Sequence, residues 1–379
     1  DGISGWRGSL LWNDNLCTKI LPTFHPAFIL RNYDAAMPTL FDLKKARDES
    51  HSIVYETAHP TLITRPTFEQ VMHELDRMEK ARKKVAFDVE TTYATLEEDM
   101  MMTSIAICDD DDWAISIPLA SDMNGWFWTQ KEWLSIIQRL KQFFESGIPI
   151  IAQNAQFDMG VLHFLYGINI PNLYLDTMCA FHTIYPELPK NLNMLRTTYT
   201  DIIYYDYMKS QGDDQFYRYN ALDAITAYRC AEPIIRELKE FGVYDFHQKF
   251  ILPLIPVLLE MQMRGMKIDT DLMTKTFKKE MEEYEKHLNA IQELTGVEQV
   301  MNPNSTKDMK WLLYEKMGLP VKTNVKTKSP TTDKKALEEL HKKYPSPLFD
   351  HIMEARHTRK MASTYLNLDN VRDGRMHTS

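Results

Sequence analysis

The order of the hydrophobic patterns is the feature that most limits how this chain can fold. From Lys84 the patterns run strand, hairpin, helix, strand and helix, and they end in a long helix over about residues 213–241. From Phe250 onward every strong pattern is helical. The helices expected there cover residues 270–294, 305–317 and 332–343. We therefore predict an α/β domain followed by an all-helical region.

Local signals define the elements of the α/β part. Residues 85–90 read V-A-F-D-V-E, the period of two that is typical of a strand. Segments 104–108 and 113–117 flank four aspartates, which predicts a hairpin. T-Q-K-E at 129–132 is a capping box that begins a helix. Residues 148–152 form a short apolar strand.

Composition excludes several classes of protein. The 379 residues are 44% hydrophobic and 26% charged, which excludes disorder, collagen and a coiled coil. The longest apolar run, residues 250–259, is too short to cross a bilayer, so we expect no membrane partner. The four cysteines are far apart and form no C-x-x-C pair. They predict free thiols and a cytoplasmic rather than secreted protein.

The charge is unevenly distributed. The net charge is −9, but residues 251–379 carry 21 Lys and Arg against 18 Asp and Glu. The first 250 residues carry 23 against 35. A basic third beside an acidic body is typical of a phosphate-binding surface next to a metal-binding one.

Carboxylates occur at three places that the pattern can bring together. Asp88 and Glu90 share one face of a strand, and Asp158 follows the apolar strand into a helix. Tyr219 and Asp223 are four residues apart and share a helix face. Each place alone is explained as well by an exposed polar face, a helix cap or a surface hydrogen bond. Together, the four acidic groups can converge on a pair of divalent cations.

That arrangement suits phosphodiester hydrolysis. Two cations about 3.5–4 Å apart stabilise both the attacking and the leaving oxygen. Oxygen ligands select Mg²⁺ (or Mn²⁺), so we expect two such ions and no small-molecule cofactor. The hydroxyl of Tyr219 can then orient the attacking water.

The same motifs resemble a known family. F-D-V-E-T-T (87–92), Q-N-A-Q-F-D (153–158) and Y-N-A-L-D-A (219–224) look like the three motifs of the proofreading 3′→5′ exonuclease of family A DNA polymerases, in the variant with Tyr in the third motif. The resemblance implies a ribonuclease H-like fold. It also implies removal of 3′-terminal nucleotides from a single-stranded DNA end.

The resemblance assigns roles to individual residues. The implied metal ligands are Asp88, Glu90, Asp158 and Asp223. Tyr219 is implied to orient the water, and Thr91 and Asn154 to contact the 3′-terminal nucleotide. Asp176, between the second and third motifs, is expected to be structural.

The basic third resembles the start of the polymerase domain and the thumb of the same family. The similar segments are 253–269, 302–307, 327–340 and 354–365. Lys322, Lys326 and Lys328 lie in a loop with no evident acidic partner, so we expect them to bind duplex phosphates. Palm and fingers motifs are absent, so we expect no DNA synthesis by this chain alone.

The N-terminal part resembles the tail of the uracil-DNA glycosylase superfamily. G-W-R-G-S (5–9) and L-P-T-F-H-P-A-F-I-L-R (21–31) carry that resemblance, which would place His25 beside a departing uracil anion. A loop histidine is the alternative. The upstream half of such a domain is missing, so we expect an inactive remnant. The chain begins with Asp1 and stops without a closing element, which suggests a segment of a longer, phage-like fusion.

These arguments predict four parts. They are a glycosylase-like remnant (1–50), a linker (51–66), the exonuclease domain (67–242) and the N-terminal part of a polymerase domain (243–379). The predicted function is metal-dependent proofreading in DNA replication. Two alternatives remain, a non-catalytic DNA-binding module of a replication protein and an RNA-trimming nuclease of the same fold. The intact motifs count against the first, and the basic thumb-like part counts against the second.

Overall fold

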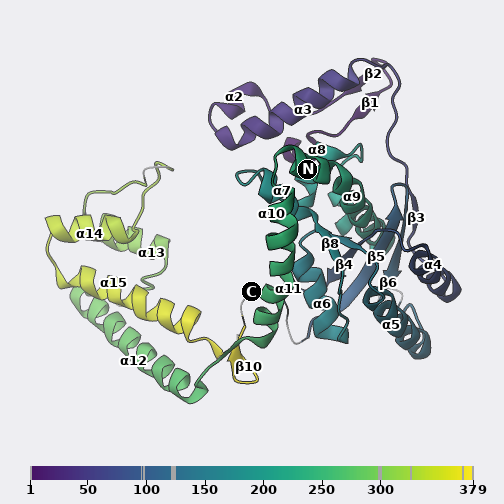
Figure 1. Cartoon of the computed structure of the whole chain (residues 1–379). Coiled ribbons are helices and arrows are strands. Elements are labelled where there is room, and N and C mark those ends of the chain that lie inside the picture. The colour runs from purple at the N-terminus through teal and green to yellow at the C-terminus, as the bar shows by residue number, and fades with distance from the viewer. Residues whose placement is uncertain are drawn as a thin grey trace. The chain divides into compact units, whose positions relative to one another are not determined.

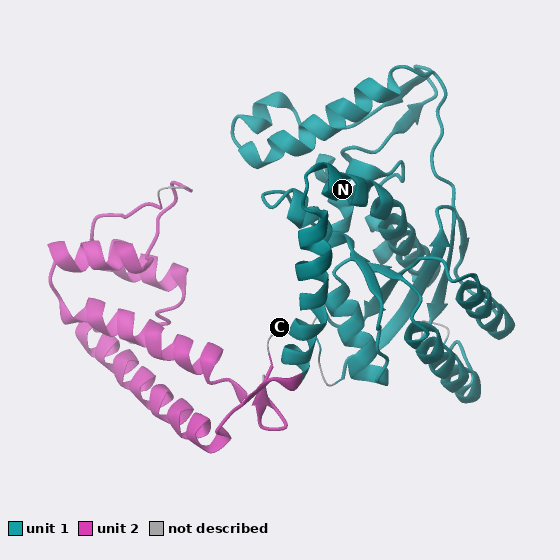
Figure 2. Ribbon diagram, in the orientation of Figure 1, with its two compact units in different colours: residues 1–263, 379 teal, residues 264–378 magenta. Residues whose placement is uncertain are grey.

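The chain folds into two compact units. The structure is a computed structural model that describes residues 2–94, 96, 99–120, 125–297, 301–324, 327–368 and 371–377. The first unit covers Asp1–Met263 and the second Arg264–Thr378 (Figure 2). Among the described residues, no helix is both long and apolar enough to span a membrane.

A six-stranded mixed sheet forms the centre of the first unit (Figure 1). Its order is β3-β6-β5-β4-β7-β8. The strands are β3 (Thr61–Ile63), β4 (Val85–Thr91), β5 (Met102–Asp110), β6 (Trp113–Pro118), β7 (Ile150–Ala152) and β8 (Leu173–Asp176). The predicted hairpin is β5 and β6, and β4 is antiparallel to β5 but parallel to β7.

Large apolar side chains cover one face of the sheet. Val85, Phe87 and Val89 point to this face, as their alternation predicts, and join a core with three helices. The helices are α4 (Phe68–Ala81), α5 (Gln130–Glu145) and α6 (Ala155–Tyr166). The capping box predicted at 129–132 is present and begins α5.

Small side chains cover the opposite face. Ala86 and Ala106 on the sheet meet Ala221 and Ala224 of the long helix α9 (Asp213–Glu240), and all four are fully buried. Methyl groups on both surfaces allow the backbone of α9 to lie close to β4 and β5. Helices α7 (Thr177–Ile184) and α8 (Leu192–Tyr199) pack beside α9.

The end of the first unit lies beyond the predicted boundary at 242/243. Helix α10 (Tyr244–Phe246) leads through a π turn (His247–Ile251) into α11 (Leu252–Arg264). Leu252, Ile255 and Leu259 of α11 join the core under the first face of the sheet. This burial holds α11 in the first unit, so the break falls after Met263.

The N-terminal part is also integrated into the first unit. It contains α1 (Ile3–Trp6), β1 (Leu11–Asn13), β2 (Thr18–Ile20), α2 (Pro26–Ile29) and α3 (Ala36–Glu49). The predicted linker 51–66 supplies β3, which pairs in parallel with β6 at the sheet edge. The prediction that all of 51–66 is a linker was therefore wrong. The strand was missed because three residues are too few to show an alternating pattern.

The second unit is mainly helical. Its helices are α12 (Thr270–Thr295), α13 (Thr306–Lys310), α14 (Lys334–Lys343) and α15 (Pro347–Lys360), and a π turn (Trp311–Lys316) extends α13. Helices α12 and α15 pack side by side (Figure 1). A small antiparallel sheet of β9 (Met266–Lys267), β10 (Val371–Arg372) and β11 (Arg375–Met376) was not predicted. Strands of two residues are too short to give a periodic signal.

Candidate active site

Three of the four predicted carboxylates meet between β4 and α9. Strand alternation turns Asp88 and Glu90 toward α9, and α9 supplies Asp223. One carboxylate oxygen of each lies within 4.8 Å of the other two. The close approach of α9 over the alanine face makes this spacing attainable.

The fourth carboxylate, Asp158, lies just beside this group. It sits in the first turn of α6 and is 4% exposed. Its Oδ1 accepts a hydrogen bond from the Val89 backbone N–H at 3.1 Å, which ties it to β4 between the other two acids. Among the described residues it is not a member of the three-carboxylate group, but its charge raises the pKa of Asp88.

Burial and mutual repulsion make the carboxylates of this group hard to ionise. Burial, followed by repulsion from Asp223 and Asp158, raises the pKa of Asp88 well above its usual value. Burial also raises the pKa of Asp158 well above its usual value. It raises the pKa of Asp223 to about 7, although the Tyr205 hydroxyl acts in the opposite direction. Carboxylates that lie this close together and have raised pKa values fit a site for a divalent cation, because the charge of the cation would favour their ionised forms.

Tyr219 lies one helical turn before Asp223, as predicted. Its side chain is half-buried, and burial together with the Asp223 charge raises the pKa of its phenol. The phenol therefore stays protonated at neutral pH and can donate a hydrogen bond. The Nζ atom of Lys209 lies 5.0 Å from the centre of the Tyr219 ring.

A buried amide orients Asp88, and the sequence argument missed it. Asn220 is fully buried, and its Nδ2 donates to Asp88 Oδ2 at 2.8 Å and to the Asp88 carbonyl at 3.2 Å. Its Oδ1 accepts from the hydroxyls of Ser104 (3.0 Å) and Ser116 (2.9 Å). The Asp88 carbonyl can only accept, so the NH₂ group must face Asp88, and the two serine hydroxyls then donate to Oδ1. A polar residue inside the third motif, on the sheet side of α9, was the available signal.

The segment 202–210 brings two further groups that the sequence argument missed. The Tyr205 hydroxyl donates to Asp223 Oδ1 at 2.6 Å, and Tyr205 is 2% exposed. Lys209 Nζ donates to Glu90 Oε2 at 3.0 Å. No motif or periodicity in this segment indicates either contact.

The remaining predicted residues, in and after the first two motifs, have clear places. Thr91 ends β4 next to Glu90, and its hydroxyl donates to the Tyr93 carbonyl at 2.5 Å. Asn154 has left-handed backbone dihedrals before α6, and its side chain is exposed. Asp176 accepts from the backbone N–H groups of Asn154 (3.3 Å), Ala155 (2.9 Å) and Cys179 (3.0 Å). These bonds anchor the starts of α6 and α7, in agreement with a structural role.

His25 has an ordinary structural contact. It precedes α2, and its Nδ1 accepts from the Ala27 backbone N–H at 3.1 Å. This is the N-cap arrangement of a loop histidine. The resemblance to glycosylases stays a prediction.

The lysine loop of the second unit differs from expectation. Thr323 pairs with Pro330, which brings Lys322 next to α14. Lys322 Nζ forms an ion pair with Glu339 Oε2 at 2.7 Å, so the expectation of an unneutralised loop was wrong at this position. Lys328 is exposed and has a positive φ of 57°. Lys326 lies outside the described residues.

A more basic surface of the second unit is a cleft between α12 and α15. Its volume is about 670 Å³, and Tyr284, Asn302, Asn304, Arg356, Arg359, Lys360 and Ser363 line it. Its described lining holds three cationic side chains and no carboxylate. Arg356 is already used to hold the carbonyls of Pro303 (2.7 Å) and Thr332 (2.6 Å). This leaves Arg359 and Lys360 as the cations most suited to an anion.

Two protein-family models match this chain. Residues 64–239 match a family model described as 3'-5' exonuclease. Residues 270–379 match the model of DNA polymerase family A. The two matches follow one another along the chain and confirm the predicted resemblance to the exonuclease and polymerase parts of family A DNA polymerases.

The similar proteins are longer than this chain. DNA polymerase I of Borreliella burgdorferi is 29% identical over 325 residues, which cover 81% of this chain and 34% of that protein. DNA polymerase I of Synechocystis is 31% identical over 248 residues, covering 61% and 24%. The chain thus spans about a third or less of these curated relatives.

A solved structure confirms the predicted fold. The POL domain of Pol1 from M. smegmatis, in complex with DNA primer-template and dNTP, matches with a TM-score of 0.60 at 20% identity. The match covers 84% of this chain and 52% of that one.

Proposed function

We propose that the first unit removes nucleotides from the 3′ end of DNA by metal-assisted hydrolysis, as the proofreading activity of a replication enzyme. The observation that carries this proposal is that carboxylate oxygens of Asp88, Glu90 and Asp223 lie within 4.8 Å of one another. These residues lie in the part of the chain that matches an exonuclease family model. A buried cluster of carboxylates with raised pKa values does not stabilise a core, whereas it suits a catalytic metal site.

The donor set fits hard divalent cations. Asp88, Glu90 and Asp223 would hold one Mg²⁺ or Mn²⁺, and Asp158 together with Asp88 would hold the second. When bound, the cations supply charge compensation at the attacking and leaving oxygens. We assign no nitrogen ligand, because the nitrogen groups at the site, Asn220 Nδ2 and Lys209 Nζ, act as hydrogen-bond donors to Asp88 and Glu90.

The chain's own residues prepare the site for hydrolysis. Asn220 fixes the orientation of Asp88, and Tyr205 fixes that of Asp223. The protonated phenol of Tyr219 can orient a water toward the phosphorus. Lys209 compensates part of the charge of Glu90.

For the substrate, we assign Thr91 and Asn154 to the 3′-terminal nucleotide, because they end β4 and begin α6 next to Glu90 and Asp158. In the second unit, Arg359 and Lys360 in the basic cleft are assigned to the phosphates of duplex DNA. The M. smegmatis structure, which contains a DNA primer-template, supports DNA as the partner. Lys322 and Lys328 are assigned as secondary phosphate contacts.

Digestion of a 5′-labelled DNA strand tests the proposal. Wild-type protein should shorten it from the 3′ end with Mg²⁺ and not with EDTA, and Asp223→Ala should abolish this shortening. Asp245→Ala is the matched control, because Asp245 is an exposed carboxylate that pairs with Lys249. Tyr219→Phe should lower the rate by about a hundredfold or less, since only water orientation is lost.

Two results would reject the proposal. Activity within a few-fold of wild type in Asp223→Ala would remove the metal assignment. A matched RNA strand that is degraded faster than DNA would favour the RNA-trimming alternative.

A further inference from the structure

The segment 202–210 needs external support to hold its place in the site. It carries Tyr205 to Asp223 and Lys209 to Glu90. Its regular structure is limited to a 3₁₀ turn over Asp206–Ser210. Its backbone has few hydrogen bonds of its own, so contacts from other elements, α9 among them, contribute to its position.

Residues 5–9 at the N-terminus provide that support. The Ser9 hydroxyl oxygen accepts from the Tyr204 backbone N–H at 3.2 Å and from Arg196 Nη1 at 3.1 Å. Trp6 packs on the Tyr204 ring, with centroids 5.2 Å apart, and lies nearly parallel to Tyr207 at 6.3 Å. The N-terminal residues therefore contact the neighbours of Tyr205 on both sides along the chain.

A buried ion pair anchors these residues. Arg7 is 4% exposed and donates to both carboxylate oxygens of Asp42, at 2.7 and 3.1 Å. It also donates to Thr197 Oγ1 of α8 at 3.0 Å. Lys45 Nζ bridges the carbonyls of Gly8 (3.1 Å) and Thr200 (2.6 Å).

The backbone fit at this interface is tight. A Cβ atom on Gly5 would lie 2.8 Å from the Tyr204 ring, and one on Gly8 would lie 2.7 Å from the Thr197 Cβ. Gly8 also has a φ of +69°, which glycine adopts without strain. A side chain would not fit at either position, so glycine at both positions allows the two surfaces to lie in direct contact.

We infer that residues 5–9 are a positioning element of the exonuclease site, which holds Tyr205 against Asp223 and Lys209 against Glu90. This inference rests on the proposed function. It assigns the N-terminal part a role in the nuclease, in addition to any origin in a glycosylase-like domain. Groups that orient metal ligands typically change metal affinity or activity by about 10–100-fold when they are removed.

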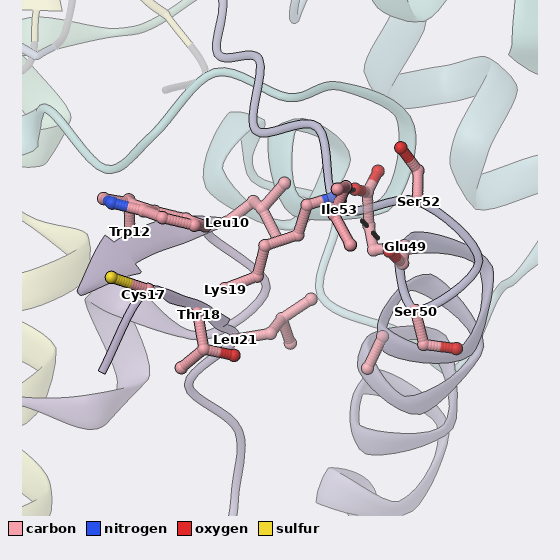
Figure 3. A pocket seen from close by; sticks show the side chains of 11 residues that line it. Leu10, Trp12, Cys17, Thr18, Lys19, Leu21, Glu49, Ser50, Ser52 and Ile53 are labelled. Carbon is pink, nitrogen blue, oxygen red and sulfur yellow. Dashed lines mark hydrogen bonds and ion pairs between the residues drawn. The ribbon is translucent and has the colours of Figure 1, made fainter. Parts of the chain in front are cut away.

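The test compares two tryptophans of the same N-terminal part. Trp6→Ala removes the contacts with Tyr204 and Tyr207. Trp12→Ala is the matched control, because Trp12 stacks on Tyr55 and lines the pocket of about 430 Å³ in Figure 3. None of the residues lining that pocket belongs to segment 202–210.

Kinetics should separate positioning from binding. Trp6→Ala should lower kcat about 10–100-fold and raise the Mg²⁺ concentration for half-maximal rate, with KM for DNA nearly unchanged. Trp6→Phe should restore most of the rate. In a Tyr205→Phe, Lys209→Met background, Trp6→Ala should add little, because both groups that it positions are already removed. Equal rates for Trp6→Ala and Trp12→Ala, or multiplicative effects in that background, would overturn the inference.

Hydrogen exchange of the metal-free protein gives a readout independent of catalysis. Peptides covering residues 202–210 should exchange faster in Trp6→Ala than in wild type or Trp12→Ala. Unchanged exchange there would refute the positioning role even if the chain were no nuclease. If faster exchange accompanies an inactive wild type, only the proposed function fails. Should Trp6→Ala not fold, Ser9→Ala decides, because it removes one acceptor from Tyr204 and should show the same changes to a smaller degree.

Discussion

Replacing Asn220 by leucine tests whether one buried amide serves both stability and catalysis. Asn220→Leu keeps the number and branching of the side-chain heavy atoms but removes four hydrogen bonds, two donated to Asp88 and two accepted from Ser104 and Ser116. All three polar partners are buried or nearly so. Each buried group left unsatisfied costs about 1–3 kcal/mol, so the substitution should lower the free energy of unfolding by about 3–5 kcal/mol.

A compensated variant separates the two roles. Asn220→Leu combined with Ser104→Ala and Ser116→Ala removes both sides of two hydrogen bonds. Removing both partners is nearly neutral, so this variant should regain about 2–3 kcal/mol. It should not regain activity, because Asp88 still lacks the donor that orients it, and cleavage should stay about 10–100-fold below wild type.

Urea denaturation followed by tryptophan fluorescence measures these changes. Six of the seven tryptophans lie in the first unit, and Trp311→Phe removes the signal of the second. The urea midpoint should fall in Asn220→Leu and recover in the compensated variant, with an unchanged slope. A loss below about 1 kcal/mol, or a compensated variant no more stable than Asn220→Leu, would refute this reasoning.

Three more predictions concern other buried or charged groups. Burial lowers the pKa of His247 to about 4, below its ordinary 6.5, so its contribution to stability is complete above pH 6.5 and is lost as the pH falls toward 4. His247→Leu should therefore weaken acid destabilisation over that range by up to about 3 kcal/mol, measured as urea midpoints against pH. Arg7→Met should destabilise the first unit by about 3–5 kcal/mol, because it leaves the buried Asp42 carboxylate without its cation. In a thermal melt, the double variant Arg7→Met, Asp42→Leu should recover most of that stability. Lys328→Ala should lower the salt slope of duplex binding by about one unit, and Lys322→Ala by less because of its ion pair; equal slopes for both would contradict this.

Local patterns predicted most elements of the fold. The alternation at 85–90, the hairpin and the long helix at 213–241 all lie where they were expected. These features depend on neighbouring residues, which a single sequence displays. The edge strand β3 and helix α11 were misassigned, because their places depend on partners far along the chain.

The same distinction holds for the site. Asp88, Glu90 and Asp223 stand at spacings that strand and helix periods bring together. Tyr205 and Lys209 approach these acids through a segment without periodicity, and that segment is held by residues about 190 positions earlier in the chain. No local rule contains such a contact.

The alanine face under α9 has a consequence for the choice of ion. Ala106 is the strand partner of Asp88 and is fully buried below α9, so its methyl group sets how far Asp223 stands from the strand. Mg²⁺ and Ca²⁺ differ by about 0.3 Å in their preferred oxygen distances. A larger side chain on this face would move α9 and Asp223 away from the strand, toward the spacing that the larger ion prefers. Cation selectivity would then be governed by an apolar surface that no ion touches, and Ala106→Val should move the preference from Mg²⁺ toward the larger ion.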